Sequence, residues 1–196
     1  MISALAEKAV DYMISSGIIS DQEKDLYVYG FFMLLSRLLF LLMSVLFGIL
    51  FDVPAESIVF YFAFFILRSY AGGIHAGSEA ACTVLTSLSM FLSVMLIKLC
   101  TVFSAVILPG ILLPVSSLAV MLLCPIDTPE KRLSAVEKKI YKKKTAFVLA
   151  VIVILGVTAL ILRRYGFFFA CTVSIVLESV LLVCARLREC GKKERA

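Results

Sequence analysis

One histidine and one cysteine close to it are the residues in this sequence whose types and spacing could do chemistry. His75 is the single histidine of the chain, and Cys82 follows it by seven residues. A thiol acts as a nucleophile in its thiolate form, and a neighbouring imidazole is the group that usually takes its proton. Gly72 and Gly73 precede the histidine and allow a sharp turn and a close approach of a substrate backbone. The pattern is compatible with a catalytic cysteine–histidine pair.

The seven-residue spacing sets a geometric condition on this pair. In one straight helix, residues seven apart share a face but are separated by about 10.5 Å along the axis. A proton transfer between them needs a hydrogen bond of roughly 3 Å. His75 and Cys82 can therefore cooperate only if the chain around Gly72–Gly77 folds back over the start of the following helix. On spacing alone, an interfacial histidine and a cysteine that serves only packing stay open as alternatives.

Other kinds of catalytic site find little support in the sequence. One histidine without clustered acidic residues provides too few ligands for a metal ion. Phosphate-binding loops, HExxH, GxSxG and dinucleotide fingerprints do not occur, so we predict no metal and no cofactor. The cysteines show no CxxC pairing, and we interpret most of them as small buried apolar residues. They are Cys82, Cys100, Cys124, Cys171, Cys184 and Cys190.

The composition places these residues in a membrane protein. Of the 196 residues, 62% are apolar and 17% are charged, and the mean hydropathy is +1.05. A globule of this size could not bury so much apolar surface in its core. The composition therefore excludes a soluble enzyme and a disordered tail. It also argues against a nucleic-acid binder, despite the net charge of +5, and makes the lipid bilayer the expected partner.

Six apolar blocks predict an all-α, polytopic integral membrane protein with about six transmembrane helices. The blocks are Phe31–Leu50, Glu56–Tyr70, Ala80–Val102, Ser104–Cys124, Thr145–Leu162 and Gly166–Ala185. We expect a single membrane domain over residues 1–196. It would consist of a cytoplasmic amphipathic segment (1–30), a six-helix bundle (31–185) with a catalytic break near 68–82, and a basic cytoplasmic tail (186–196).

The segments before and between the blocks predict helix starts and an orientation. Apolar residues at helical spacing indicate an amphipathic helix over Ile2–Ile14. A capping-box pattern at Ser20–Glu23 leads into the first block. Thr128-Pro129-Glu130 predicts the start of a cationic helix that runs into the fifth block. With both termini in the cytoplasm, fifteen Lys and Arg residues fall inside and three outside, which fits the positive-inside rule.

Charged residues at or within the blocks need partners. Glu178 lies inside the sixth block, where an acid is costly and usually paired. Arg37 is a possible partner, although snorkelling of Arg37 towards the cytoplasm is the simpler account. Arg68 ends the second block, and we expect it to contact headgroups or carbonyl groups, or else to hold a substrate carboxylate.

Two sequence motifs resemble the AgrB family, the accessory gene regulator B proteins of bacterial quorum sensing. The first motif is Arg68-x-x-Ala71-Gly72-Gly73-x-His75-Ala76-x-Ser78-x-x-x-Cys82. The second is Pro125-x-Asp127, which precedes the charged run Glu130–Lys144. The resemblance covers nearly the whole chain. It implies a cysteine endopeptidase of the bacterial cytoplasmic membrane that processes an AgrD-like pro-peptide into a cyclic autoinducing peptide, and it also allows a homodimer.

The resemblance also assigns roles by position. Cys82 matches the nucleophile and His75 the general base, so an acyl-thioester would form on Cys82 and resolve to a cyclic thiolactone or lactone. The third, orienting residue is not identified, and Ser78, Glu79 and Asp127 are candidates. The rival interpretation is a small peptide or solute transporter in which the break near 68–82 is only a gate.

Overall fold

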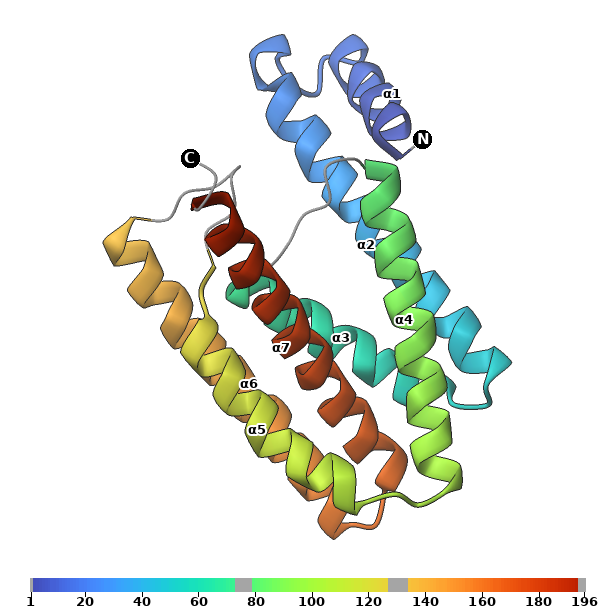
Figure 1. The fold of residues 1–196 in the computed structure, drawn as a ribbon. Helices are drawn as coiled ribbons and strands as arrows, with labels where there is room; N and C mark the ends of the chain where they lie inside the picture. Colours follow the sequence, from blue (N-terminus) through green and yellow to red (C-terminus); the bar gives the residue numbers. More distant parts are fainter. Residues whose placement is uncertain (1, 73–78, 127–133, 194–196) are drawn as a thin grey trace. The chain divides into compact units, whose positions relative to one another are not determined.

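Helices make up nearly all of the structure, a computed structural model that describes residues 2–72, 79–126 and 134–193. No strand occurs among these residues, which confirms the all-α prediction. In chain order the elements are α1 (Ile2–Ser15), the 3-10 helix η1 (Asp21–Glu23), α2 (Lys24–Leu50), α3 (Pro54–Ala71), α4 (Glu79–Val102), α5 (Ile107–Leu123), α6 (Ala135–Ile161) and α7 (Tyr165–Lys193) (Figure 1). They form two compact units, Met1–Met43 and Ser44–Ala196.

Several of the described helices suit a membrane by length and composition. Four are long and apolar enough to cross a bilayer, namely Asp21–Leu50, Ala80–Val102, Ala135–Ile161 and Tyr165–Arg188. α5 is apolar but has 17 residues, and α3 has 18 residues that include Glu56 and Arg68. α5 exposes large apolar side chains at helical spacing, as lipid contact requires: Ile107, Ile111, Val115, Leu118 and Leu122. The chain is a multi-pass membrane protein, and crossing by α3 and α5 stays a prediction.

The N-terminal unit contains the expected amphipathic helix. In α1, Ala6 and Val10 are buried while Glu7 and Lys8 are exposed. An ion pair of 2.7 Å joins Asp11 of α1 to Lys24 at the start of α2. The next helix begins after Ser20 as predicted, but the Ser20 hydroxyl donates to the Glu23 carboxylate at 3.0 Å and makes no bond to a backbone N–H group.

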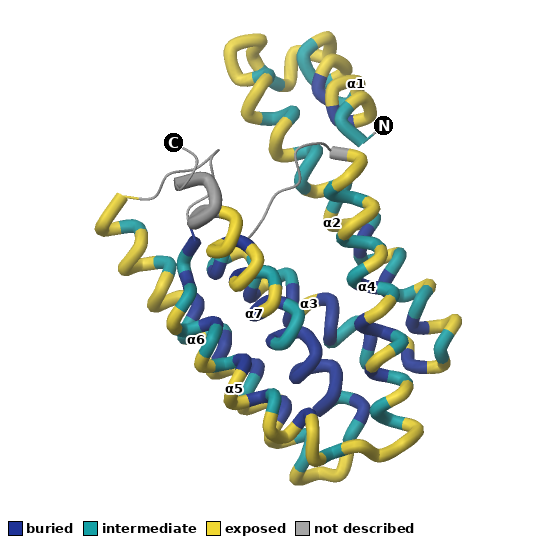
Figure 2. The backbone as a smooth tube through the Cα atoms, viewed as in Figure 1, coloured by how far each residue is buried: buried dark blue, intermediate teal, exposed yellow. Residues whose placement is uncertain are grey.

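α7 is the central helix of the second unit. About 61% of its apolar stretch is buried inside the protein, against 22% for α4 and for α6. Figure 2 shows this buried stretch surrounded by helices whose outer sides are exposed. Small residues allow close contact: a Cβ atom added at Gly156 of α6 would lie 3.2 Å from the Cβ of Cys171 in α7. α3, α4, α5 and α6 all pack against α7.

Three tight turns join consecutive helices at one end of the second unit. They follow α2, α4 and α6, and each contains one residue with a positive φ angle: Asp52, Ser104 and Arg163. The turns lie together at the lower end in Figure 1. Lys98 of α4 pairs with Asp52 at 3.6 Å at this end. α3 and α5 end, and α4 and α6 begin, at the opposite end of the unit, where the sequence predicts the cytoplasm.

α6 begins later than the sequence predicted. Its N-cap is Ser134, whose hydroxyl accepts from the Glu137 N–H group at 3.3 Å. The Glu137 carboxylate in turn accepts from the Ser134 N–H group at 2.8 Å. This reciprocal capping box satisfies two otherwise unpaired donors at the start of the helix. The predicted start at Thr128-Pro129-Glu130 is therefore wrong for α6 as described, and those three residues lie outside the described part of the chain.

Candidate functional site

The end of α3 is joined to the central helix by a buried ion pair. Nη1 of Arg68 lies 3.5 Å from Oε2 of Glu178 in α7. The Glu178 side chain is fully buried and that of Arg68 is 22% exposed. The Arg68 guanidinium also lies over the Phe64 ring, 5.9 Å from its centroid. The partner of Glu178 is thus Arg68, which the sequence analysis assigned to headgroups, carbonyl groups or a substrate carboxylate.

Gly72 ends α3 in a conformation that only glycine adopts readily. Its φ and ψ angles are 84° and −162°, and its N–H group donates to the Arg68 carbonyl at 3.1 Å. A Cβ atom added here would lie 2.6 Å from the carbonyl oxygen of Ile126. The glycine therefore has two physical reasons to stand here: the backbone angle and the close approach of a second chain segment.

That second segment is the short stretch after α5. The Ile126 N–H group donates to the Ala71 carbonyl at 3.1 Å, and both Ile126 and Cys124 are buried. The structure therefore brings together the two stretches singled out in the sequence, the one that begins at Arg68 and the one that begins at Pro125. Sequence reasoning gave no contact between them. The only signal was their joint occurrence in the family resemblance.

We expect Gly72→Ala to destabilise the protein and reduce its activity. The substitution adds a Cβ against the Ile126 carbonyl at an unfavourable backbone angle, at a cost of about 2–4 kcal/mol. Thermal unfolding in detergent measures the loss. Gly110→Ala in α5 is the matched control, since an added Cβ meets nothing within 4 Å there. Equal melting temperatures for the two variants would contradict this account of the Gly72 contact.

Cys82 lies in the first turn of α4. The helix begins at Glu79, and the Cys82 side chain is partly exposed. The unpaired backbone N–H groups at a helix N-terminus favour negative charge nearby. A shared straight helix would keep His75 and Cys82 too far apart to cooperate. The described part of α4 begins at Glu79, after His75, so it does not contain both residues.

Of the remaining predicted site residues, the structure describes one. Glu79 is placed as the first residue of α4. Gly73, His75, Ser78 and Asp127 lie outside the described residues. Their nearest described neighbours are placed: Gly72 directly precedes Gly73, and Ile126 directly precedes Asp127. The pairing of His75 with Cys82 stays a prediction, as does the identity of a third, orienting residue.

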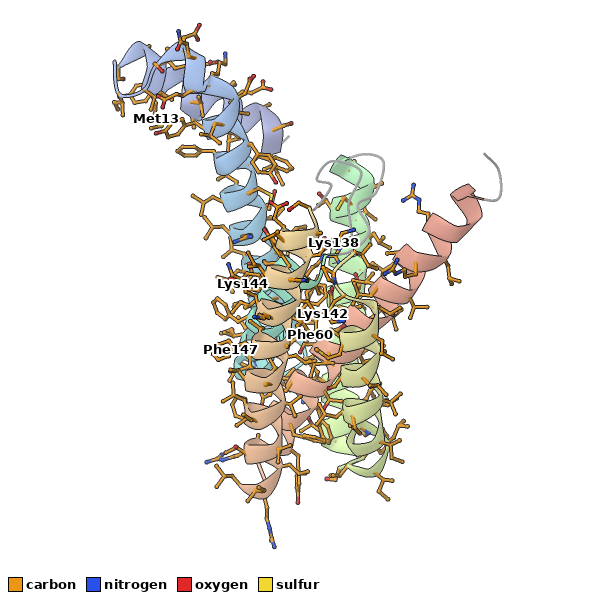
Figure 3. The ribbon with its side chains drawn as sticks, turned by 90° about the vertical axis from the view of Figure 1, so that its left-hand side faces the viewer. Met13, Phe60, Lys138, Lys142, Lys144 and Phe147 are labelled. Carbon is orange, nitrogen blue, oxygen red and sulfur yellow. The ribbon has the colours of Figure 1, made fainter. Side chains whose placement is uncertain are left out.

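A cationic, aromatic surface adjoins the end of α3. An open groove of about 380 Å³ between α3 and α6 is lined by Ile66, Tyr70, Lys143, Lys144, Phe147 and Val148. Nζ of Lys144 lies 5.6 Å from the centroid of the Tyr70 ring. Figure 3 labels two of these lining residues, Lys144 and Phe147, on α6. A groove lined by apolar side chains and two lysines suits a ligand that is both apolar and anionic.

The described residues contain no group of three or more His, Cys, Asp and Glu side chains that could hold a metal ion. In residues 134–145, at the start of α6, Glu137 is the only acid among five lysines. The functional groups at this end of the second unit are thus the Cys82 thiol at the N-terminus of α4, the buried ion pair and a cluster of ammonium groups. This set of groups suits nucleophilic attack on a carbonyl group in a peptide held near anionic headgroups.

Comparisons with known proteins identify the family. The chain matches the family described as accessory gene regulator B over residues 6–182. "Putative AgrB-like protein" of Clostridium perfringens (strain SM101 / Type A) is 26% identical over 181 residues, which cover 89% of this chain and 84% of the relative. "Putative AgrB-like protein 2" of Clostridium perfringens (strain 13 / Type A) is 28% identical over 162 residues, which cover 79% and 76%. No solved structure matches the chain. Because the match spans most of its length, the chain belongs to the accessory gene regulator B family of quorum-sensing membrane proteins.

Proposed function

We propose that this protein is a membrane cysteine endopeptidase that cleaves an AgrD-type pro-peptide at the inner leaflet of the bacterial cytoplasmic membrane. The observation that carries the proposal is the family match over residues 6–182, because the family processes peptides. The Gly-Gly-x-His-x6-Cys motif stands within the matched region. The position of Cys82 in the first turn of α4 supports the same proposal, because it combines partial exposure with a helix N-terminus.

The proposed reaction begins with proton transfer from the Cys82 thiol to the His75 imidazole. The thiolate attacks the carbonyl carbon of the scissile peptide bond, and a tetrahedral intermediate forms. The C–N bond then breaks, His75 returns the proton to the leaving amine, and the N-terminal part of the substrate stays on Cys82 as an acyl-thioester. A thiol or hydroxyl group of the same substrate then attacks the thioester, closes a thiolactone or lactone ring and releases the Cys82 thiol.

The surroundings of Cys82 suit a substrate that lies at the membrane surface. The link between Gly72 and Glu79 has six residues and spans at most about 25 Å. α4 itself is 24 residues long, or about 36 Å. The start of α4 therefore stands at the same end of the second unit as the last turn of α3. The lysines of α6 lie at this end, where they attract anionic lipid and acidic peptide segments.

Cleavage by the purified protein tests the proposal. A synthetic pro-peptide with the protein in liposomes should be cut without any other protein present. Alkylation of Cys82, verified by mass spectrometry of its peptide, should stop cleavage and leave pro-peptide binding intact. If the alkylated protein still cleaves the pro-peptide, the proposed mechanism is wrong. If the untreated protein moves the pro-peptide across the liposome membrane without cutting it, the transporter interpretation is correct.

The proposed orientation gives a separate prediction. Val136 of α6 and Phe103 of the turn after α4 are apolar, and they are 68% and 75% exposed. In intact cells, a membrane-impermeant maleimide should label Phe103→Cys above the background of the native cysteines and should spare Val136→Cys. Both variants should react after the cells are permeabilised. Labelling of Val136→Cys from outside would reverse the orientation and place Cys82 in the wrong compartment for an inner-leaflet substrate.

A further inference from the structure

The proposed reaction gives no role to the buried carboxylate of Glu178. Glu178 lies within the apolar stretch of α7 and is fully buried. Among the described residues its ion-pair partner is Arg68, at 3.5 Å, and neither carboxylate oxygen makes a hydrogen bond there. An acid in the interior of a membrane protein is expensive and usually serves a function. The described contact through which Glu178 can act is the ion pair with Arg68, in the last turn of α3.

Stability alone does not account for this ion pair. Two charges taken out of water lose hydration that their mutual attraction only partly returns, so an apolar pair of similar volume is often at least as stable. What a buried ion pair supplies instead is a fixed geometry, because each charge must stay close to its partner. Glu178 therefore holds Arg68, and with it the end of α3, at one place along α7.

Two further contacts extend this restraint to the start of the catalytic break. The Arg68 carbonyl accepts the N–H group of Gly72, and the Ala71 carbonyl accepts the N–H group of Ile126, each at 3.1 Å. The ion pair and the Ile126 contact thus hold the last turn of α3 from two sides. The chain leaves this turn at Gly72, and three residues later it reaches His75.

We infer that Glu178 is a positioning residue, which fixes the exit of the chain from α3 at Gly72 through Arg68, and that the activity of the proposed His75–Cys82 pair depends on this fixed exit. The inference rests on the proposed function, because it gives His75 the role of general base. It also assigns Arg68 to Glu178 instead of to a substrate carboxylate. Loss of the negative charge at residue 178 releases the last turn of α3 while leaving Cys82 and the start of α4 unchanged.

Glu178→Gln is the principal test, because it removes the charge and keeps the size of the side chain. Asp52→Asn is the matched control, since it removes the acid of the Lys98 ion pair at the opposite end of the unit. We expect kcat for pro-peptide cleavage to fall about 100-fold in Glu178→Gln, as misplacement of a reacting group by about 1 Å can cost. KM should change little, and Asp52→Asn should match the unsubstituted protein.

A second readout separates positioning from a loss of fold. The rate at which iodoacetamide alkylates Cys82, followed by mass spectrometry of its peptide, depends on pH through the group that takes the thiol proton. The pH profile of Glu178→Gln should match that of His75→Ala, while Asp52→Asn keeps the profile of the unsubstituted protein. Circular dichroism and gel filtration in detergent show that the compared variants are folded.

If Glu178→Gln does not fold, Glu178→Asp and Arg68→Lys take its place, because both keep the charges and lengthen the gap between them. We expect these folded variants to lose kcat in the same direction. Unchanged kcat and an unchanged alkylation profile in the folded variants would overturn the inference. Failure of the proposed function would look different. Either the unsubstituted protein would not cleave the pro-peptide, or His75→Ala would leave both cleavage and the pH profile of Cys82 alkylation unchanged.

Discussion

Replacement of Cys82 by alanine is expected to lower the rate of pro-peptide cleavage by about 10⁴-fold or more. The reason is chemical: alanine cannot form the acyl-thioester, and removal of a nucleophile leaves only the contributions of binding and electrostatics. The measurement is cleavage of a synthetic AgrD-type pro-peptide by the purified variant in liposomes. Equal pro-peptide binding by the variant and the unsubstituted protein would show that only the chemical step is lost.

The other cysteines provide the controls for this prediction. Among them, Cys124 and Cys171 are buried, Cys100 is partly buried and Cys184 is exposed. Replacement of each by alanine should leave the same product and a cleavage rate close to that of the unsubstituted protein. Cys184→Ala is the strictest comparison, because the Cys184 thiol is exposed and lies on α7 towards the same end of the second unit as Cys82. Cleavage of the pro-peptide by Cys82→Ala would show that the proposed protease mechanism is wrong.

The helices were predictable because the signal for each is local. Runs of apolar residues long enough to cross a bilayer are rare outside membrane helices, and α2, α4, α6 and α7 each contain one. The amphipathic pattern of α1 is equally local, and its observed end at Ser15 differs by one residue from the prediction. The start of α6 was missed because two capping patterns follow one another in the sequence. The one at Ser134 satisfies two backbone donors at once, and Thr128 lies outside the described residues.

The contacts around the candidate site could not be predicted from local signals. Arg68 and Glu178 are more than a hundred residues apart, and their pairing depends on how α3 packs against α7. The sequence showed that an acid at position 178 needs a partner. It offered Arg37 as that partner, and it offered headgroups, carbonyl groups or a substrate carboxylate to Arg68. The approach of Ile126 to Gly72 likewise depends on the placement of α5. Helix positions follow from composition, whereas partners follow from packing.

The position of Gly72 illustrates how far sequence reasoning extends. Adjacent glycines predict a turn, and the φ angle of 84° at Gly72 agrees with that prediction. They do not reveal that the carbonyl group of Ile126 occupies the space of the missing side chain. The same glycine thus has a local role, which the sequence shows, and a long-range role, which only the packed helices show.

The N-terminal product of cleavage is expected to be a ring and not a linear acid. The proposed acyl-thioester on Cys82 keeps much of the energy of the cleaved peptide bond, so either water or a group of the substrate can resolve it. The start of α4 exposes apolar side chains, among them Val84 and Leu85, and lipid or substrate that covers them would limit the access of water. A nucleophile held in the same peptide can reach an effective molarity of about 10⁵ M or more, far above the ~55 M of water.

Mass spectrometry of the product decides between the two outcomes, because the ring contains one water less than the linear acid. The reaction uses purified protein and pro-peptide in liposomes, sampled from the earliest measurable times. A pro-peptide in which the ring-closing thiol or hydroxyl is replaced by alanine is the matched control, and it should give a slow reaction that yields only the linear acid. A synthetic ring incubated under the same conditions shows whether hydrolysis follows closure. If the unsubstituted pro-peptide yields only the linear acid while the synthetic ring survives, Cys82 transfers its acyl group to water, and the ring is closed elsewhere.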